Sequence, residues 1–132
     1  MTEEEVIDTV IKHMKTQFPR SCVCCGQQYE TLRDFCATTQ PAGQPVVFDP
    51  YPENAAAKEP LGSAAFSNCR CGTSMALSSK GMPLLQYWAL IRWGYNEMIR
   101  RRMTQDELLQ YLREKCHEKV MAEPGMVSSV RQ

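Results

Sequence analysis

The sequence contains two cysteine-rich turns, Cys22-Val23-Cys24-Cys25-Gly26 and Cys69-Arg70-Cys71-Gly72. In each turn two thiols lie at short spacing and glycine follows directly. Glycine permits the positive φ angle of a tight turn whose backbone amides face the sulfurs. Two such turns supply four thiolates, the number that closes a tetrahedral structural zinc site. We therefore predict that one structural Zn²⁺ is bound by Cys22, Cys25, Cys69 and Cys71.

The two turns resemble the zinc-ribbon and zinc-knuckle class, in which two cysteine pairs on separate hairpins hold one Zn²⁺. The resemblance covers about residues 20–77 and lies in the motif alone. The second pair departs from the class, because one residue instead of two separates Cys69 from Cys71. If the first pair has the same short spacing, Cys24 replaces Cys22 or Cys25 as a ligand.

Other uses of the thiols remain open at this point. The chain has 7 cysteines, an odd number that does not suit a disulfide framework. The first turn also has the spacing of an iron–sulfur ligand pair or a redox-active thiol pair, and free cysteines are often simply buried. We assign Cys36 and Cys116 to core faces. His13 and His117 lack a second ligand at metal spacing, so we place both on helix surfaces.

The remaining pattern predicts an α+β fold. A small zinc-knuckle and β-hairpin unit with four cysteine ligands packs with an N-terminal helix and a C-terminal αα-hairpin. Capping boxes and apolar periodicity predict helices over 3–17 and 105–121, with a shorter helix over 29–38. A hairpin is expected over 65–79, and a long loop with one short strand between Pro41 and Pro60. We expect one domain over 1–122, with a zinc-knuckle part at 20–79, the helical hairpin at 83–122 and a flexible tail at 123–132.

The strongest helical signal begins at Leu84. Apolar residues repeat there at spacings of four and three, namely Leu84, Trp88, Ile91, Tyr95 and Met98. We predict that this stripe makes the helix the most buried element, with Trp88 at its centre. Trp93 lies about 140° away on an ideal helix. Because apolar residues surround most of the 84–99 helix, we expect it to bind a protein partner or a second copy of the chain, with Trp93 in that contact.

The composition and motifs of the sequence disfavour several classes of function. The chain has 15 basic and 15 acidic residues, a balance that disfavours binding nucleic acid mainly through its phosphates. Nucleotide-binding and catalytic motifs are absent from the sequence, so we do not expect an enzyme. The acidic start lacks the features of a secretory signal and no apolar run is long enough for a membrane span, which favours the cytoplasm.

We therefore expect a small zinc-stabilised adaptor or regulatory protein. A zinc-ribbon-like nucleic-acid-binding protein is the first alternative, because basic residues gather around Arg100-Arg101-Arg102. A thiol or metal redox sensor is the second, because thiolate sites lose metal on oxidation.

Overall fold

The computed structural model describes residues 1–43, 45–48 and 62–123, and of residues 46–48, 62 and 63 it describes the backbone. Within these residues the chain forms four helices and two small antiparallel sheets, as predicted for an α+β fold. The elements in chain order are α1 (Glu3–Lys15), β1 (Arg20–Ser21), β2 (Gln28–Tyr29), α2 (Leu32–Thr38), β3 (Gln40–Pro41), β4 (Val46–Phe48), β5 (Gly62–Asn68), β6 (Ser74–Ser78), α3 (Leu84–Arg101) and α4 (Gln105–Ala122). Most of the predicted loop between Pro41 and Pro60, and the predicted tail beyond Glu123, lie outside the described residues.

Threonine caps fix where α1, α2 and α4 begin. Thr2 and Thr104 each accept a hydrogen bond from the third helical amide and form complete capping boxes at α1 and α4. The prediction for the 29–38 helix is wrong at its start. Thr31 caps α2 by accepting a hydrogen bond from the Asp34 amide, so Tyr29 belongs to strand β2. Helix α1 ends at Lys15, two residues earlier than predicted.

The larger sheet is organised around β5. This strand pairs with β6 over residues 64–68, and β3 and β4 pair with its two ends, all antiparallel. The register pairs Asn68 with Ser74, so the predicted hairpin is confirmed and the turn at 69–72 caps its end. Strands β1 and β2 form a separate pair that carries the other cysteine turn. The sheet topology therefore presents both cysteine turns at the tips of antiparallel pairs.

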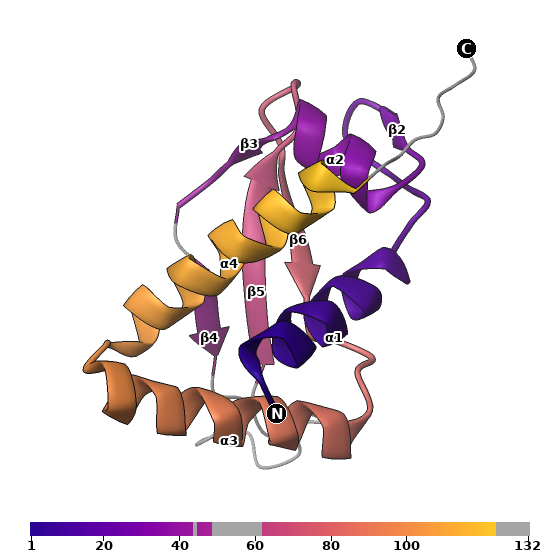
Figure 1. Cartoon of the computed structure of the whole chain (residues 1–132). Coiled ribbons are helices and arrows are strands. Elements are labelled where there is room, and N and C mark those ends of the chain that lie inside the picture. The colour runs from indigo at the N-terminus through magenta and orange to yellow at the C-terminus, as the bar shows by residue number, and fades with distance from the viewer. Residues whose placement is uncertain (44, 49–61, 124–132) are drawn as a thin grey trace, which may run out of the picture.

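Helices α1 and α4 lie together against the sheet, and α3 crosses near the opposite end from α2 (Figure 1). The core has three clusters. One joins α1, α2 and α4 around Ile11, Leu32 and Val120, and a second surrounds the cysteine turns. The third brings α1, α3 and α4 together at Val6, Trp93 and Leu108.

The predicted orientation of α3 is wrong. Trp93 is buried, with 8% of its surface exposed, whereas Trp88 is 38% exposed. The buried residues of the helix are Tyr87 and Trp93, so α3 is not the most buried element. Trp93 packs against Val6 and Leu108, while the predicted core residues Leu84 and Tyr95 lie on the exposed side. Two apolar stripes with helical spacing run along this helix, and periodicity alone does not say which one faces inward.

Within the described residues, no helix combines the length and the apolar character needed to cross a membrane.

Candidate metal centre

The structure brings together the four cysteines predicted as ligands. The sulfur atoms of Cys22, Cys25, Cys69 and Cys71 all lie within 4.8 Å of one another. Two contacts join the turns: Cys22 Sγ is 3.7 Å from Cys71 Sγ, and Cys25 Sγ is 3.6 Å from Cys69 Sγ. The four thiols are thus close enough to bind a single metal ion.

The sulfur separations fit a tetrahedral ion better than they fit disulfides. Zinc–sulfur bonds of about 2.3 Å place tetrahedral ligands roughly 3.8 Å apart, close to the two observed cross-turn distances. A disulfide bond is far shorter, at about 2.05 Å, and all seven cysteines are free thiols. The size of the cluster therefore matches a four-sulfur metal site.

The two turns share one backbone design despite their different lengths. In the first, the Cys22 amide donates to the Gln27 carbonyl at 2.9 Å, and the Gly26 amide donates to the Cys22 carbonyl at 2.9 Å. In the second, the Cys69 amide donates to the Thr73 carbonyl at 2.8 Å, and the Gly72 amide donates to the Cys69 carbonyl at 2.7 Å. The second turn closes one residue earlier, which accommodates its one-residue ligand spacing.

The glycine after each pair is required by its conformation. Gly26 has φ of +78° and Gly72 has φ of +93°, angles that strain any residue with a Cβ. Neither position is crowded, because an added Cβ would meet no other heavy atom within 4 Å. The requirement for glycine is thus set by the backbone alone.

Hydrogen bonds make one sulfur much more acidic than its neighbour. The Cys71 amide, followed by the Tyr29 hydroxyl, lowers the pKa of the Cys69 thiol to about 6. The Gln27 amide favours the Cys25 thiolate, but desolvation and the neighbouring sulfurs outweigh it and raise the pKa of Cys25 to about 12. These hydrogen bonds therefore favour the thiolate form of Cys69, which is the form that binds a metal cation.

The sequence pattern did not identify Tyr29 as part of this centre. Its hydroxyl donates to Cys69 Sγ at 3.0 Å, and its ring is buried against Phe35 at a centroid distance of 5.2 Å. Burial, followed by the neighbouring Cys69, raises the pKa of Tyr29 to about 12, so the phenol stays protonated and able to donate. A tyrosine four residues after Cys25 is too weak a signal to predict such a contact. Thr73 Oγ1 lies 3.2 Å from Cys71 Sγ on the other side.

A small apolar cluster packs against the buried side of the two cysteine turns. Phe35 and Met75 pack with Tyr29 and with the two buried cysteines, Cys22 and Cys69. Cys25 and Cys71 are exposed on the solvent side. The site therefore has one buried and one exposed cysteine from each turn, and its solvent side is open to an incoming ion.

The other candidate residues lie apart from the cluster. Cys24 is exposed and does not join the group of four, whereas Cys116 is buried and Cys36 partly buried, as predicted for core positions. The His13 Nε2 atom lies 3.0 Å from the Lys80 carbonyl oxygen, and His117 is exposed on α4. Neither histidine belongs to the metal-ligand group found among the described residues.

Comparison with protein families, with curated proteins and with solved structures finds no significant match to this chain.

Proposed function

We propose that this chain is a structural-zinc protein that acts as a protein-interaction adaptor. The observation that carries the proposal is the convergence of four thiols from two separated turns within 4.8 Å. Zinc is the preferred ion because a tetrahedral four-thiolate set suits it and because each turn supplies two ligands. The metal would tie residues 20–29 to the β5–β6 hairpin.

The ligand set favours a structural over a catalytic metal. A catalytic zinc has three protein ligands and keeps one position open for water or substrate. Here four thiols would fill all four positions. Four thiolates also transfer so much charge to the ion that it becomes a weak Lewis acid, poorly suited to activating water. The metal would therefore hold the fold together.

The exposed side of α3 supplies the surface for an interaction. Its large apolar residues include Leu85 at 86% exposure and Ile99 at 77%, and Leu84, Trp88 and Tyr95 are also exposed. Leu85, Trp88, Tyr95 and Ile99, with Arg92 between them, repeat at spacings of three and four, the seam of a helix that packs on another helix. Exposed apolar residues gathered in this way are typical of a binding surface.

The charges along this seam favour a different protein over a second copy of the chain. Arg92 lies at its middle and forms no ion pair within the described part of the chain. A symmetric pairing centred on the seam would place Arg92 against its own copy, which is unfavourable. The fitting partner is an amphipathic helix with acidic residues beside its apolar face.

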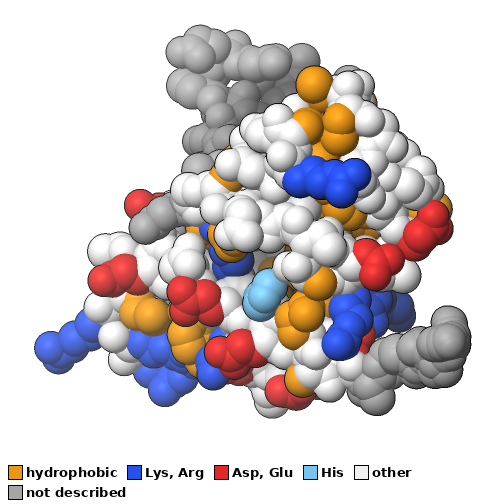
Figure 2. Space-filling view, turned by 90° about the horizontal axis from the view of Figure 1, so that it is seen from above, with side chains coloured by type: hydrophobic (Ala, Val, Ile, Leu, Met, Phe, Trp, Pro, Cys, Tyr) orange, Lys and Arg blue, Asp and Glu red, His pale blue; other side chains and the backbone are white. Residues whose placement is uncertain are grey.

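The basic residues give less support to nucleic-acid binding. Arg101 pairs with Glu3 and Glu97, Arg100 pairs with Glu97, and Lys119 pairs with Glu4 and Asp8. Trp93 is buried and so is not available to stack on bases. On the face in Figure 2, acidic and basic side chains are interspersed. A stripe of unpaired cations, which phosphate binding needs, is thus not seen among these groups.

Elemental analysis of protein purified without added metal tests the metal site. We expect one equivalent of zinc in the natural chain and its loss in Cys71→Ser. Cys24→Ser is the matched control, because it removes a thiol from the first turn without touching the four-sulfur group, and it should keep full zinc. Retention of zinc by Cys71→Ser, or one to four equivalents of iron in place of zinc, would contradict the proposal.

Binding measurements test the adaptor role separately. A panel of amphipathic helical peptides that carry glutamates beside an apolar face should bind the natural chain, and Leu85→Asp should abolish that binding while zinc content stays at one equivalent. Peptides with lysine in place of glutamate are the control and should bind at least tenfold more weakly. Equal affinity for both peptide sets, or binding that survives Leu85→Asp, would remove α3 as the docking surface.

A further inference from the structure

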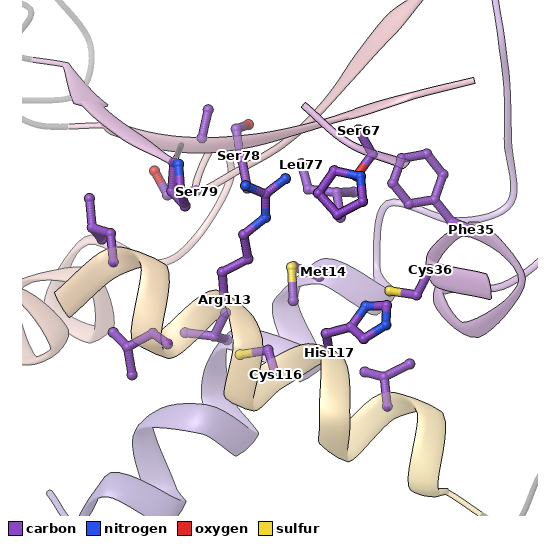
Figure 3. A pocket seen from close by; sticks show the side chains of 18 of the residues that line it. Met14, Phe35, Cys36, Ser67, Leu77, Ser78, Ser79, Arg113, Cys116 and His117 are labelled. Carbon is purple, nitrogen blue, oxygen red and sulfur yellow. The ribbon is translucent and has the colours of Figure 1, made fainter. Parts of the chain in front are cut away.

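A cavity of about 200 Å³ lies between the larger sheet and the helices. Its walls come from every helix and from strands β5 and β6, so it is a gap between the two layers of the fold. Figure 3 shows Arg113 and His117 projecting from α4 toward this space, with Ser67 and Leu77 of the sheet on its other side. The cavity is separate from the cysteine cluster and has no role in the function proposed above.

The composition of the sheet explains why the space is left open. The strand positions along it carry small side chains, among them Ala64, Ala65, Ser67 and Ser78. A sheet that packs on helices usually presents branched aliphatic residues, which fill such a gap and make close contacts. Because the sheet lacks such residues, a gap remains between Leu112 of α4 and Leu77. Its volume equals that of several water molecules, at roughly 30 Å³ per molecule. The side chains around such a gap lack packing partners on one side, and an apolar ligand would supply them.

The walls are mostly uncharged. Met14 and Leu90 contribute apolar surface, and two thiols lie along the helical side. Burial raises the pKa of Cys36 to about 11 and, as the largest cause, that of Cys116 to about 12, so both thiols stay neutral at physiological pH. A bound molecule would thus meet a largely apolar interior.

Arg113 is the exception, a half-buried guanidinium in the wall of this apolar space. It donates to the Gly43 carbonyl at 2.6 Å and to the Phe66 carbonyl, and none of the ion pairs in the described part of the chain includes it. Desolvation lowers the pKa of Arg113, and the charge of Glu114 offsets only part of this effect. Two of its five N–H donors are used, which leaves donors for an anion.

We propose that this cavity binds a small carboxylate with an apolar chain. The carboxylate pairs with Arg113, and the chain lies between the sheet and the helices beside Met14 and Leu77. His117, one turn after Arg113 on α4, stands at the rim as a second donor. The volume suits a chain of roughly six to eight carbons. The anion would supply the ion pair that Arg113 does not form within the described part of the chain.

Octanoate is the probe for this site, and the methionines report its position. In protein labelled with ¹³C at the methionine methyl groups, titration should shift the signals of Met14 and Met82, which line the cavity. Met98 and Met103 pack in the α1–α3–α4 cluster and do not line the cavity, so they serve as internal controls. Shifts that saturate below the micelle concentration are expected. Absence of any shift at Met14 and Met82 at millimolar octanoate would overturn the proposal.

Three further titrations test the chemistry. Octanol, with the same chain and no charge, should bind roughly tenfold more weakly, as should octanoate to Arg113→Lys. Lys115→Gln removes a charge from the same helix outside the cavity and should leave the affinity unchanged. Equal binding of octanol and octanoate would show that Arg113 does not select the head group.

A cavity-filling variant separates a site from surface association. Ala65→Leu should abolish octanoate binding and raise the melting temperature, because leucine occupies the space. Ser67→Val serves the same purpose if Ala65→Leu fails to fold. Unchanged octanoate binding in a folded filling variant would place the ligand elsewhere and overturn the proposal.

Discussion

The cysteine end and the α3 end of the molecule are held together by different means. The cysteine end has strands of two residues, β1 and β2, and an apolar cluster built around Tyr29 and Phe35. The α3 end has two helices of 18 residues each, a capping box on α4 and a buried tryptophan. A two-residue strand pair has too few contacts to be stable alone. The first end is therefore the one that the proposed metal would stabilise most, whereas the second is held by packing.

Metal removal gives the largest expected difference between the two ends. After zinc is chelated, hydrogen exchange should become fast over 20–29 and 69–73, because structural zinc contributes roughly 10–16 kcal/mol of apparent binding free energy in small sites. Protection in α3 and α4 should persist. Hydrogen-exchange mass spectrometry measures both regions in one sample. Equal loss of protection at both ends would show that the chain unfolds as one unit and that the contrast between them is wrong.

Trp93→Ala tests the packed end. Removal of a buried tryptophan costs about 3–5 kcal/mol, since it opens a cavity between Val6 and Leu108. We expect a large drop in the denaturation midpoint with zinc content unchanged. Urea titration followed by zinc analysis checks both parts. If Trp93→Ala lost zinc as well as stability, the two ends would be coupled through α1.

Tyr29→Phe tests how far the metal centre depends on its surroundings. Loss of a hydrogen bond to a ligand typically weakens metal affinity by roughly 10–100-fold, and here the Tyr29 hydroxyl is one cause of the lowered pKa of Cys69. Without it the pKa of Cys69 should rise. Protons would then compete with zinc at a higher pH, so metal release on acidification should begin earlier in Tyr29→Phe. A pH titration of zinc release measures the shift, and identical release curves would exclude the role of the hydroxyl.

Glu3 offers a smaller effect at the helical end. Its carboxylate accepts from Arg101 at 2.6 Å and from Tyr111 at 2.9 Å, and the Arg101 hydrogen bond is the main reason that the pKa of Glu3 is lowered. A lowered carboxyl pKa stabilises the fold above the unfolded pKa, and this contribution is lost as pH falls through the folded value. Glu3→Gln should cost about 1 kcal/mol or less at pH 7 and remove this part of the acid sensitivity. Thermal melts at pH 7 and pH 3.5 compare the two chains.

Trp88→Ala has the smallest expected effect on stability, within about 0.5 kcal/mol. Trp88 is 38% exposed on the outer side of α3, so the comparison with Trp93→Ala separates the two faces of one helix. Binding of acidic amphipathic peptides should weaken in Trp88→Ala and should persist in folded Trp93→Ala. Strong destabilisation by Trp88→Ala would instead support the prediction from periodicity, in which Trp88 is buried.

The cysteine turns could be predicted because their chemistry is local. Two thiols and a following glycine specify a turn whatever surrounds them, and the structure places Cys22, Cys25, Cys69 and Cys71 together. Which side of α3 is buried could not be predicted in the same way. Trp88 and Trp93 lie on two stripes of similar apolar character, and only the positions of Val6 and Leu108 decide between them. Tertiary neighbours therefore determine what periodicity leaves open.

Tyr29 and Arg113 lay beyond prediction for a related reason. Each acts through a partner far away in the chain, Cys69 for Tyr29 and the Phe66 carbonyl for Arg113. Nothing in the residues next to them indicates these contacts. The capping threonines, in contrast, have partners three residues away, and the sequence reveals them directly.

The long stretch between Cys25 and Cys69 separates the two cysteine turns in time while the chain is being synthesised. At roughly 5–20 residues per second, a ribosome would release the first turn several seconds before the second. During that interval the first pair of thiols would have no partner turn, and an early metal ion would hold only two of its four ligands. The four-cysteine group would therefore come together late in synthesis, only after the β5–β6 hairpin has emerged from the ribosome.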